Sequence, residues 1–327
     1  MKKSLVALAA LAGIAGSAAA QSSVTLFGVV DAAARYSKAS GQDKKSLISG
    51  GSSTARFGVR GVEDLGGGLK AGFWLESELG TDAGSAGADG KFWNRRATIS
   101  LTGEFGEIRL GRDKGSSRLV VDEFDIYSTV GNGAVNKVYG LPGASFINRF
   151  DNQVKYVLPE LGGLYGSVDV SAGEGTDPLN KSIGGRLGYK VGGFKIAGGY
   201  SESGVSNKFK HLSVGTSYDF GTVALNGLFT QNKSGANSID VWTLGAVAPV
   251  FGSGAVSAQV SFANGSAKVG DAKHFTVGYQ HNLSKRTAFY TTASVIDNDS
   301  PAAFSVDLKP NAGGRSGAID VGVKHSF

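Results

Sequence analysis

The sequence predicts an all-β protein, a single sixteen-stranded antiparallel transmembrane β-barrel. Three observations support this fold class. Segments of alternating apolar and polar residues recur along the chain, short and long connections follow one another in strict turn, and an export leader precedes a chain that contains no cysteine. An exported chain without cysteine has no disulfide framework, so its stability has to come from a large closed structure.

The amino terminus has the pattern of a secretory signal peptide. Two lysines precede an apolar stretch that ends at Ile14, and Ala18–Ala20 supply the small residues of a cleavage site. We therefore expect a signal peptide over residues 1–20 and one mature domain over residues 21–327. The apolar stretch is far shorter than the roughly 20 residues of a membrane helix, and no later stretch is longer, which excludes a helical membrane protein.

The stretch Trp93–Asp113 shows the repeating unit most clearly. Apolar side chains occupy every second position from Ala97 to Leu101, which is the period of a strand with one apolar face. Residues 103–106 break the alternation and a second arm resumes it up to Leu110, so the stretch is predicted to be a β-hairpin. Its apolar face would meet the core of a soluble sandwich or the lipid around a barrel.

The order of the connections decides between these alternatives. About seven short turns alternate with about eight longer polar segments, which requires about sixteen strands with both termini on the short-turn side. A Greek-key sandwich would scatter long connections over both ends, whereas a closed meander keeps them on one side. The short turns are expected near 64–68, 103–106, 159–163, 191–193, 219–221, 251–254 and 282–285, and the long loops near 37–52, 81–90, 113–148, 173–181, 202–209, 231–238, 264–272 and 296–314.

The last predicted strand, Gly317–Phe327, alternates without interruption. Its outer face is expected to carry Ile319, Val321, Val323, His325 and Phe327, and its inner face Asp320, Gly322, Lys324 and Ser326. The terminal Phe327, combined with the leader and this strand, resembles the carboxy-terminal signal that the outer-membrane barrel-assembly machinery reads.

Several segments together resemble the general trimeric porins of Gram-negative outer membranes, of the type common in β-proteobacteria. They are QSSVTLFGVVDAA, TARFGVRGVEDLGGGLKAGFWLE, NRRATISLTGEFGEIRLGRD, HNLSKRTAFY and VGVKHSF, which are spread from the start of the mature chain to its end, and the resemblance extends over nearly the whole mature chain. The resemblance implies a homotrimer in outer-membrane lipid and lipopolysaccharide, with the third long loop folded into each barrel. It also implies a water-filled channel for small anions and other polar solutes, without a cofactor, a metal or a nucleic-acid partner.

The resemblance also implies the residues of the pore constriction. In the family a basic cluster on the barrel wall faces acidic residues on the infolded loop, for which the longest loop, 113–148, is the candidate. An ordinary exposed loop is the alternative for that segment, although loops beyond roughly 12–15 residues are usually functional or disordered. The family pattern matches Arg56, Arg95 or Arg96, and Arg149 on the wall, and the loop carries Asp122, Glu123 and Asp125. Strand parity adds Arg60 to the expected constriction residues.

Strand parity refines the wall positions, because the neighbours of a lipid-facing residue face the lumen. Phe57 and Val59 are expected to point outward, as are Ala97, Ile99, Val154 and Tyr156. By this rule the lumen-facing side chains are Arg56, Arg60, Arg96, Arg149, Gln153 and Lys155. Arg95 then lies at the rim or in an irregular strand start, so parity alone favours Arg96 over Arg95.

The net charge of the chain bears on whether the channel prefers anions or cations. The formal charge of +6 becomes +4 when Lys2 and Lys3 leave with the leader. Such a small positive net charge contributes only to solubility unless the arginines cluster at one place in the fold. Guanidiniums gathered in the lumen repel one another by about 1 kcal/mol per pair at 4 Å in water, so the cluster needs facing carboxylates or passing anions, or its members are simply solvated. We expect a preference for anions.

Other chemistry finds little support in the sequence. The sequence contains four histidines, which are scattered without the spacing of metal ligands. No GxSxG motif or cysteine nucleophile is present. Asp297 and Asp299 in the last long loop form either a cation site or a solvated loop tip. An outer-membrane barrel enzyme and a plugged adhesin remain as alternative functions, and conductance in a planar bilayer separates a pore from both.

Overall fold

The computed structural model describes residues 23–88, 90–144, 146–174, 181–250 and 252–327. The expected signal peptide, residues 1–20, and most of the expected loop at 173–181 lie outside these residues. The strands are β1 (Ser23–Ala39), β2 (Gln42–Ser49), β3 (Arg56–Gly66), β4 (Leu69–Gly80), β5 (Ser85–Ala86), β6 (Arg96–Gly103), β7 (Gly106–Lys114), β8 (Arg149–Val157), β9 (Leu164–Ser171), β10 (Ser182–Val191), β11 (Phe194–Ser203), β12 (Phe209–Asp219), β13 (Ala224–Ser234), β14 (Asn237–Val250), β15 (Gly254–Gly265), β16 (Ala272–Asn282), β17 (Thr287–Asn298) and β18 (Arg315–Ser326). The helices are α2 (Ser116–Phe124) and the 3₁₀ helix η1 (Val135–Val138).

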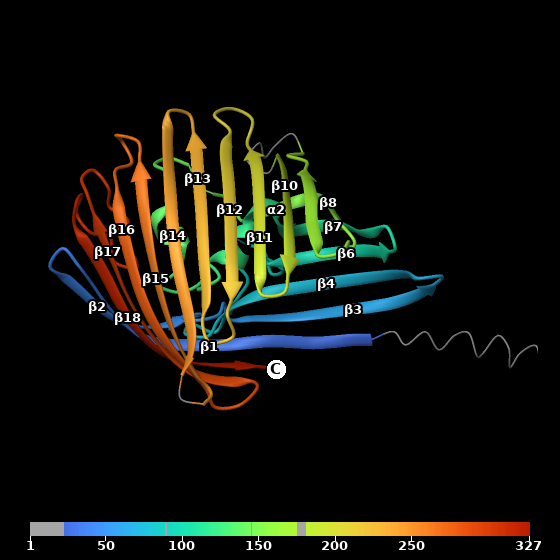
Figure 1. Ribbon diagram of the computed structural model, residues 1–327, viewed down its shortest axis with the longest axis horizontal. Helices are drawn as coiled ribbons and strands as arrows, with labels where there is room; N and C mark the ends of the chain where they lie inside the picture. Colours follow the sequence, from blue (N-terminus) through green and yellow to red (C-terminus); the bar gives the residue numbers. More distant parts are fainter. Residues whose placement is uncertain (1–22, 89, 145, 175–180, 251) are drawn as a thin grey trace, which may run out of the picture.

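The strands form a closed antiparallel barrel (Figure 1). β1 pairs with β18 on one side, which joins the first strand to the last. On its other side β1 pairs with β3 near its start and with β2 near its end, so β2 and β3 are successive pieces of one barrel strand. β5 is a two-residue strand in the connection between β4 and β6. The described strands therefore make the predicted sixteen-stranded barrel.

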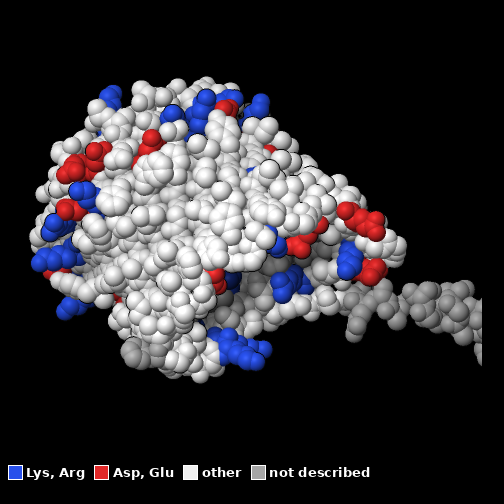
Figure 2. Space-filling model, viewed as in Figure 1, with Lys and Arg blue, Asp and Glu red and all other residues white. Residues whose placement is uncertain are grey.

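The faces of the strands follow the predicted alternation. In β18, Ile319 is 51% exposed and Val321 43%, whereas Asp320 between them is fully buried inside. His325 and Phe327 are exposed on the same outer face, as expected. Figure 2 shows a broad band of uncharged residues across the barrel, with Lys, Arg, Asp and Glu gathered toward its margins. Such a band is what a strand barrel presents to the hydrocarbon of a membrane.

The expected short turns are confirmed as brief connections between the named strands, except that residue 251 of the turn at 251–254 lies outside the described residues. Both ends of the described chain lie on the same side of the barrel as these turns. The amide of Gly28 donates to the carbonyl of Phe327 over 3.0 Å, and Ser23 pairs with Val62 beside the turn after β3. Two of the expected long loops are wrong. Much of 37–52 belongs to β1 and β2, and most of 231–238 belongs to β13 and β14. Polar residues there mark strand ends that rise above the apolar band, where both faces meet water.

Residues 115–144 and 146–148, hereafter the inner loop, lie inside the barrel. Helix α2 packs against the inner side of β9 to β13 and lies within the curve of the sheet in Figure 1. Its apolar residues Val120, Val121 and Phe124 are fully buried between the loop and the wall. The ring of Phe124 lies where a side chain at Gly215 of β12 would project. The main hydrophobic core of the protein thus lies inside the barrel, beneath the inner loop.

Polar side chains of the wall hold the rest of the inner loop. The Nδ2 of Asn132 donates to the carbonyl of Thr292 over 3.0 Å, and the Nε2 of His274 lies 3.1 Å from the carbonyl of Asn132. Farther along the loop, the Nδ2 of Asn232 donates to the carbonyl of Tyr139 over 2.8 Å. The bonds from His274 and Asn232 satisfy loop carbonyls that would otherwise be left unpaired, and the bond from Asn132 fastens a loop side chain to the wall backbone.

A buried ion pair joins the first and last strands. Arg35 of β1 and Asp320 of β18 are register partners, and the guanidinium meets both carboxylate oxygens at 2.7 Å. The two side chains are 9% and 0% exposed. Removing only one partner of such a pair lowers stability strongly, because the remaining charge is buried without a partner and is poorly solvated.

We expect Asp320→Ala to destabilise the barrel by about 3–5 kcal/mol, the usual cost of removing one partner of a buried pair. The measurement is the temperature at which the folded, heat-modifiable form is lost on a gel. Asp297→Ala is the matched control, since Asp297 also receives two bonds from an arginine, Arg315, across β17 and β18. That pair is exposed, so its loss should change the transition little. Equal effects of the two variants would contradict the assignment.

We expect Gly215→Ala to push α2 into the lumen and lower the single-channel conductance. A Cβ at this position would lie 2.2 Å from the ring of Phe124, so the helix has to shift, and overpacking of this kind costs about 1–3 kcal/mol. Gly198→Ala on the neighbouring strand is the control, because its nearest neighbour would be 3.8 Å away. A normal conductance in Gly215→Ala would show that the helix does not rest on β12.

Candidate pore constriction

A cavity of about 750 Å³ lies between the inner loop and the barrel wall, to which β3, β4, β7, β8 and β14 to β18 contribute lining residues. It is the space that the inner loop leaves open at its level in the barrel. Six cationic side chains line it but only two carboxylates do. The cations are Arg56, Arg95, Lys114, Arg118, Arg149 and Lys324, and the carboxylates are Glu78 and Asp122.

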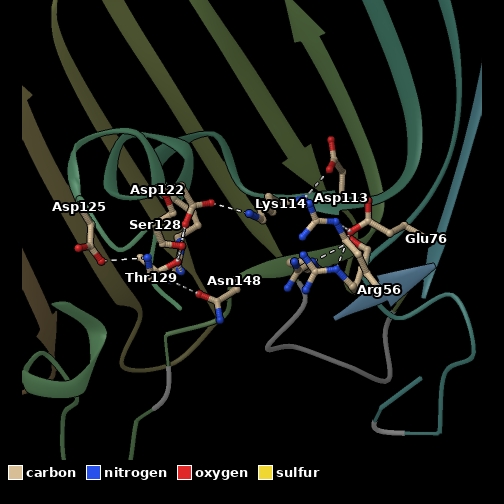
Figure 3. Close-up of polar contacts among 12 residues, drawn as sticks. Arg56, Glu76, Asp113, Lys114, Asp122, Asp125, Ser128, Thr129 and Asn148 are labelled. Atoms are coloured by element: carbon tan, nitrogen blue, oxygen red, sulfur yellow. Dashed lines mark hydrogen bonds and ion pairs between the residues drawn. The ribbon is translucent and has the colours of Figure 1, made fainter. Parts of the chain in front are cut away.

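Two of the wall arginines share one carboxylate. The Nε of Arg95 donates to Glu76 over 2.5 Å, and the Nε of Arg56 lies 3.9 Å from the same oxygen. The Nη1 of Arg56 also donates to the carbonyl of Thr54 over 3.1 Å. Figure 3 shows Arg56 and Glu76 together on the wall side of the cavity. One negative charge therefore serves two guanidiniums, which leaves an excess of positive charge beside the open space.

Arg149 adds a third guanidinium without a carboxylate partner among the described residues. Its Nε donates to the carbonyl of Arg95 over 2.8 Å, which ties the start of β8 to the start of β6. Parity predicted its inward position, but the register of β7 and β8 shifts between Gly111 and Asp113, and Asn152 has a positive φ of 51°. A bulge of this kind breaks the alternation. Arg149 reaches the cavity because it is the first residue after the inner loop.

Arg60 and Arg96 face inward as parity predicts, yet neither lines the cavity. The guanidinium of Arg96 lies 4.5 Å from the ring centre of Trp74, and that of Arg60 lies 5.0 Å from it. Both stack on the wall by a cation–π contact. Of the two candidates, Arg95 lines the cavity and Arg96, which parity favoured, does not. Arg95 precedes β6, where the chain is irregular and parity does not apply.

On the inner loop, Asp122 is the carboxylate that lines the cavity. It lies 2.6 Å from the Nζ of Lys114 and 2.9 Å from the Nε of Arg118, as Figure 3 shows for Lys114. Burial alone would raise the pKa of Asp122, but the charges of Arg118 and Lys114 outweigh it and hold that pKa below its usual value. The carboxylate stays ionised and is neutralised by two cations.

The other two acidic residues expected on the loop lie elsewhere. Glu123 turns to the wall, where it accepts a bond of 2.8 Å from the hydroxyl of Tyr165 and lies 3.5 Å from Arg186. Asp125 is 1% exposed and accepts bonds from the backbone amides of Tyr127, Thr129 and Val135. Burial raises its pKa, against the lowering effect of those amides. Asp125 organises the turn of the loop, away from the cavity (Figure 3).

The sequence reasoning missed four charged residues of the cavity: Lys114, Arg118, Lys324 and Glu78. Lys324 was placed on the inner face of the last strand, and that parity was the available signal. Arg118 lies inside α2, four residues before Asp122, and an i to i+4 pair in a helix would have indicated it. Lys114 and Glu78 lie near strand ends, where alternation carries little information.

The described residues contain no helix that is long and apolar enough to span a membrane. Within the same residues no group of three His, Asp or Glu side chains is arranged to hold a metal ion. Asp297, considered as part of a cation site, is paired with Arg315 at 2.8 Å. The side-chain amide of Asn298, the next residue, donates to the backbone carbonyls of Phe304 and Gly314.

Known proteins with this sequence pattern and this shape are porins. The family model described as Gram-negative porin matches residues 7–301. Outer membrane porin protein 32 of Delftia acidovorans is 38% identical over 354 aligned residues, and the major outer membrane protein P.IB of Neisseria meningitidis is 29% identical over 356, each alignment covering both chains completely. The solved anion-selective porin from Comamonas acidovorans has a TM-score of 0.84 and 35% identity, over 94% of this chain and 100% of that one. The chain therefore belongs to the Gram-negative porin family.

Proposed function

We propose that the protein is an anion-preferring channel of the outer membrane, through which small hydrophilic solutes diffuse passively. The observation that carries the proposal is the charge around the cavity, six cations against two carboxylates. The relative from Comamonas acidovorans, which is similar to this chain in sequence and fold, is described as anion-selective, and this supports the same direction of preference here.

The arrangement explains how a net positive field survives opposite charge. Asp122 is compensated by Lys114 and Arg118, and Glu76 is shared by Arg56 and Arg95. Arg149 and Lys324 have no carboxylate within ion-pair distance among the described residues, so no ion pair neutralises their charges directly. Low-dielectric walls focus such a field on the narrow passage and raise the local concentration of anions.

Elsewhere on the wall, opposite charges pair off. The guanidinium of Arg109 lies 2.9 Å from Glu107 and 2.6 Å from Asp113, and the buried Nζ of Lys155 lies 2.9 Å from Asp113. Cancellation there concentrates the positive field at the cavity. The preference thus follows from how these charges are placed, more than from the small net charge of the chain.

Diffusion through a pore accounts for the site better than catalysis or adhesion. The described lumen contains an open cavity lined by charges and hydroxyls, and a barrel enzyme would require a nucleophile or base of a kind that we do not find assembled there. We therefore propose no enzymatic activity and no cofactor.

The assembly of the protein is also part of the proposal. We infer a homotrimer in outer-membrane lipid and lipopolysaccharide, as the family resemblance implies, and recognition of the last strand by the barrel-assembly machinery. Phe327 supports that role, because its backbone bonds to Gly28 while its ring lies over that glycine on the outer face. The ring is 43% exposed, so another protein could reach it before the barrel closes.

We expect a reversal potential of anionic sign when the channel separates dilute potassium chloride solutions of unequal concentration. Salt should weaken the preference, since the screening length falls from about 30 Å at 0.01 M to about 3 Å at 1 M. Arg56→Ala combined with Arg149→Ala should move the potential toward the cation side, because it removes two of the six cavity cations. Arg315→Ala, at an exposed outer pair, is the control and should change nothing.

A wild-type channel that prefers cations would contradict the proposal. So would a double variant with the selectivity of the wild type, because it would show that the two guanidiniums are screened from the passing ion.

We expect conductance to appear in units that close in three equal steps, because a trimer contains three separate pores. Single-channel recording of the purified protein at high voltage measures this. Closure in a single full step, or a monomeric mass for the active channel in detergent, would contradict the trimer while leaving the pore itself intact.

A further inference from the structure

A short segment interrupts the barrel strand formed by β2 and β3. Residues 50–55, hereafter the wall insert, lie between the two strands and fold toward the lumen. Four of them, Gly51 to Thr54, line the same cavity as the constriction cations. The insert is therefore a second element of chain that enters the pore, on the wall side opposite the inner loop.

One buried carboxylate holds the wall insert in place. Asp31 of β1 is fully buried, and its oxygens accept bonds from the amides of Gly51 (3.2 Å), Ser52 (3.1 Å) and Ser53 (2.6 Å). The hydroxyl of Tyr290 donates to the same carboxylate over 2.5 Å. Successive amides that converge on a carboxylate make strong charge-assisted bonds, and each amide would be costly to leave unpaired in a buried position.

The wall insert in turn contacts cavity cations on β3 and β18, the two strands that flank β1. The Nη1 of Arg56 donates to the carbonyl of Thr54 and lies 3.4 Å from the Oγ of Ser53. The Nζ of Lys324 donates to the Oγ of Ser52 over 3.4 Å. Two cavity cations are thus oriented by groups of the insert.

The insert also touches the inner loop. A Cβ built on Gly131 would lie 2.0 Å from the carbonyl oxygen of Gly51, so the two backbones meet where neither has a side chain. Gly131 has a φ of 75°, which glycine adopts readily. The wall insert and the inner loop together close the rim of the pore at this point.

We propose that Asp31 is a positioning residue for ion selectivity. Its carboxylate folds the wall insert into the lumen, and the insert keeps Arg56 and Lys324 directed at the passing ion while it supports the inner loop at Gly131. The proposal deepens the anion preference proposed above and rests on it for the direction of the effect.

If Asp31 positions the insert, its removal changes the anion preference in the direction opposite to the one that its charge alone would give. Asp31 is a negative charge close to the cavity, so removing it should strengthen anion preference if charge alone mattered. In Asp31→Asn, however, one carboxylate oxygen becomes an NH2 group that cannot accept. Either the bonds from Gly51 and Tyr290 or the bonds from Ser52 and Ser53 are then lost, and the insert loosens. Arg56 then loses its contact with Thr54 and moves toward Glu76, from which it is now 3.9 Å away. The pore widens and its positive field weakens.

Glu78→Gln is the matched control for Asp31→Asn. Glu78 also lies at the cavity, and its carboxylate accepts a bond of 3.3 Å from the side chain of Asn94 but none from the wall insert. Both substitutions replace one carboxylate by an amide of nearly the same shape. Asp31→Asn should lower the anion-to-cation permeability ratio by about twofold or more and raise the single-channel conductance, whereas Glu78→Gln should raise the ratio.

Tyr290→Phe provides a second route in case Asp31→Asn does not fold into a heat-modifiable barrel. It removes one of the four donors to Asp31 without a change of charge, so it should lower the ratio in the same direction but less. All variants are measured as reversal potentials in the same dilute potassium chloride gradient, together with conductance.

A ratio that rises in Asp31→Asn, as in Glu78→Gln, would show that Asp31 acts only through its charge and would overturn the proposal. Unchanged selectivity and conductance in Asp31→Asn would overturn it as well, and so would a wild-type ratio in Tyr290→Phe if that variant alone can be measured. A wild-type channel without anion preference would refute the proposed function, yet opposite shifts in Asp31→Asn and Glu78→Gln would still support the positioning role.

Discussion

Closure of the barrel determines the other features of the fold. A sheet in lipid cannot leave an edge with unpaired backbone groups, so the first strand has to pair with the last. Here the register of β1 and β18 meets this need, and the buried pair of Arg35 and Asp320 lies on that seam. Once the sheet is closed, every second side chain must face either lipid or lumen. The polar lumen and the apolar belt follow from the same alternation.

The inner loop turns this lumen into a selective passage. Its apolar residues form a core with the barrel wall, and wall side chains such as His274 and Asn232 satisfy its backbone. Packing on one side of the lumen leaves the other side open, where Arg56, Arg95 and Arg149 lie. The acidic side chains of the loop bond to the loop's own backbone or pair with neighbouring cations. The loop therefore narrows the pore without cancelling the positive charge of the wall.

The sequence predicted the barrel well because alternation and connection length report directly on which groups meet lipid. It predicted the site less well, because the decisive residues lie where the alternation fails. Arg95 precedes its strand, and Arg149 follows the inner loop next to a bulge at Asn152. For Asp125 the sequence shows a charge on a loop but not the three amides that converge on it. The wall insert gave no sequence signal at all, since its polar residues resemble an ordinary loop.

In the conducting pore, as we propose it, the inner loop rests on the wall. The chain has no cysteine, so a pair introduced as Ser117→Cys and Ser201→Cys, whose hydroxyl oxygens are now 2.7 Å apart, would report on this contact alone. The most direct measurement is the conductance and reversal potential of this variant before and after oxidation. Our account predicts that the disulfide forms in the folded protein and leaves both quantities unchanged. Failure to form the disulfide, or a large change of conductance when it forms, would show that the conducting loop lies elsewhere.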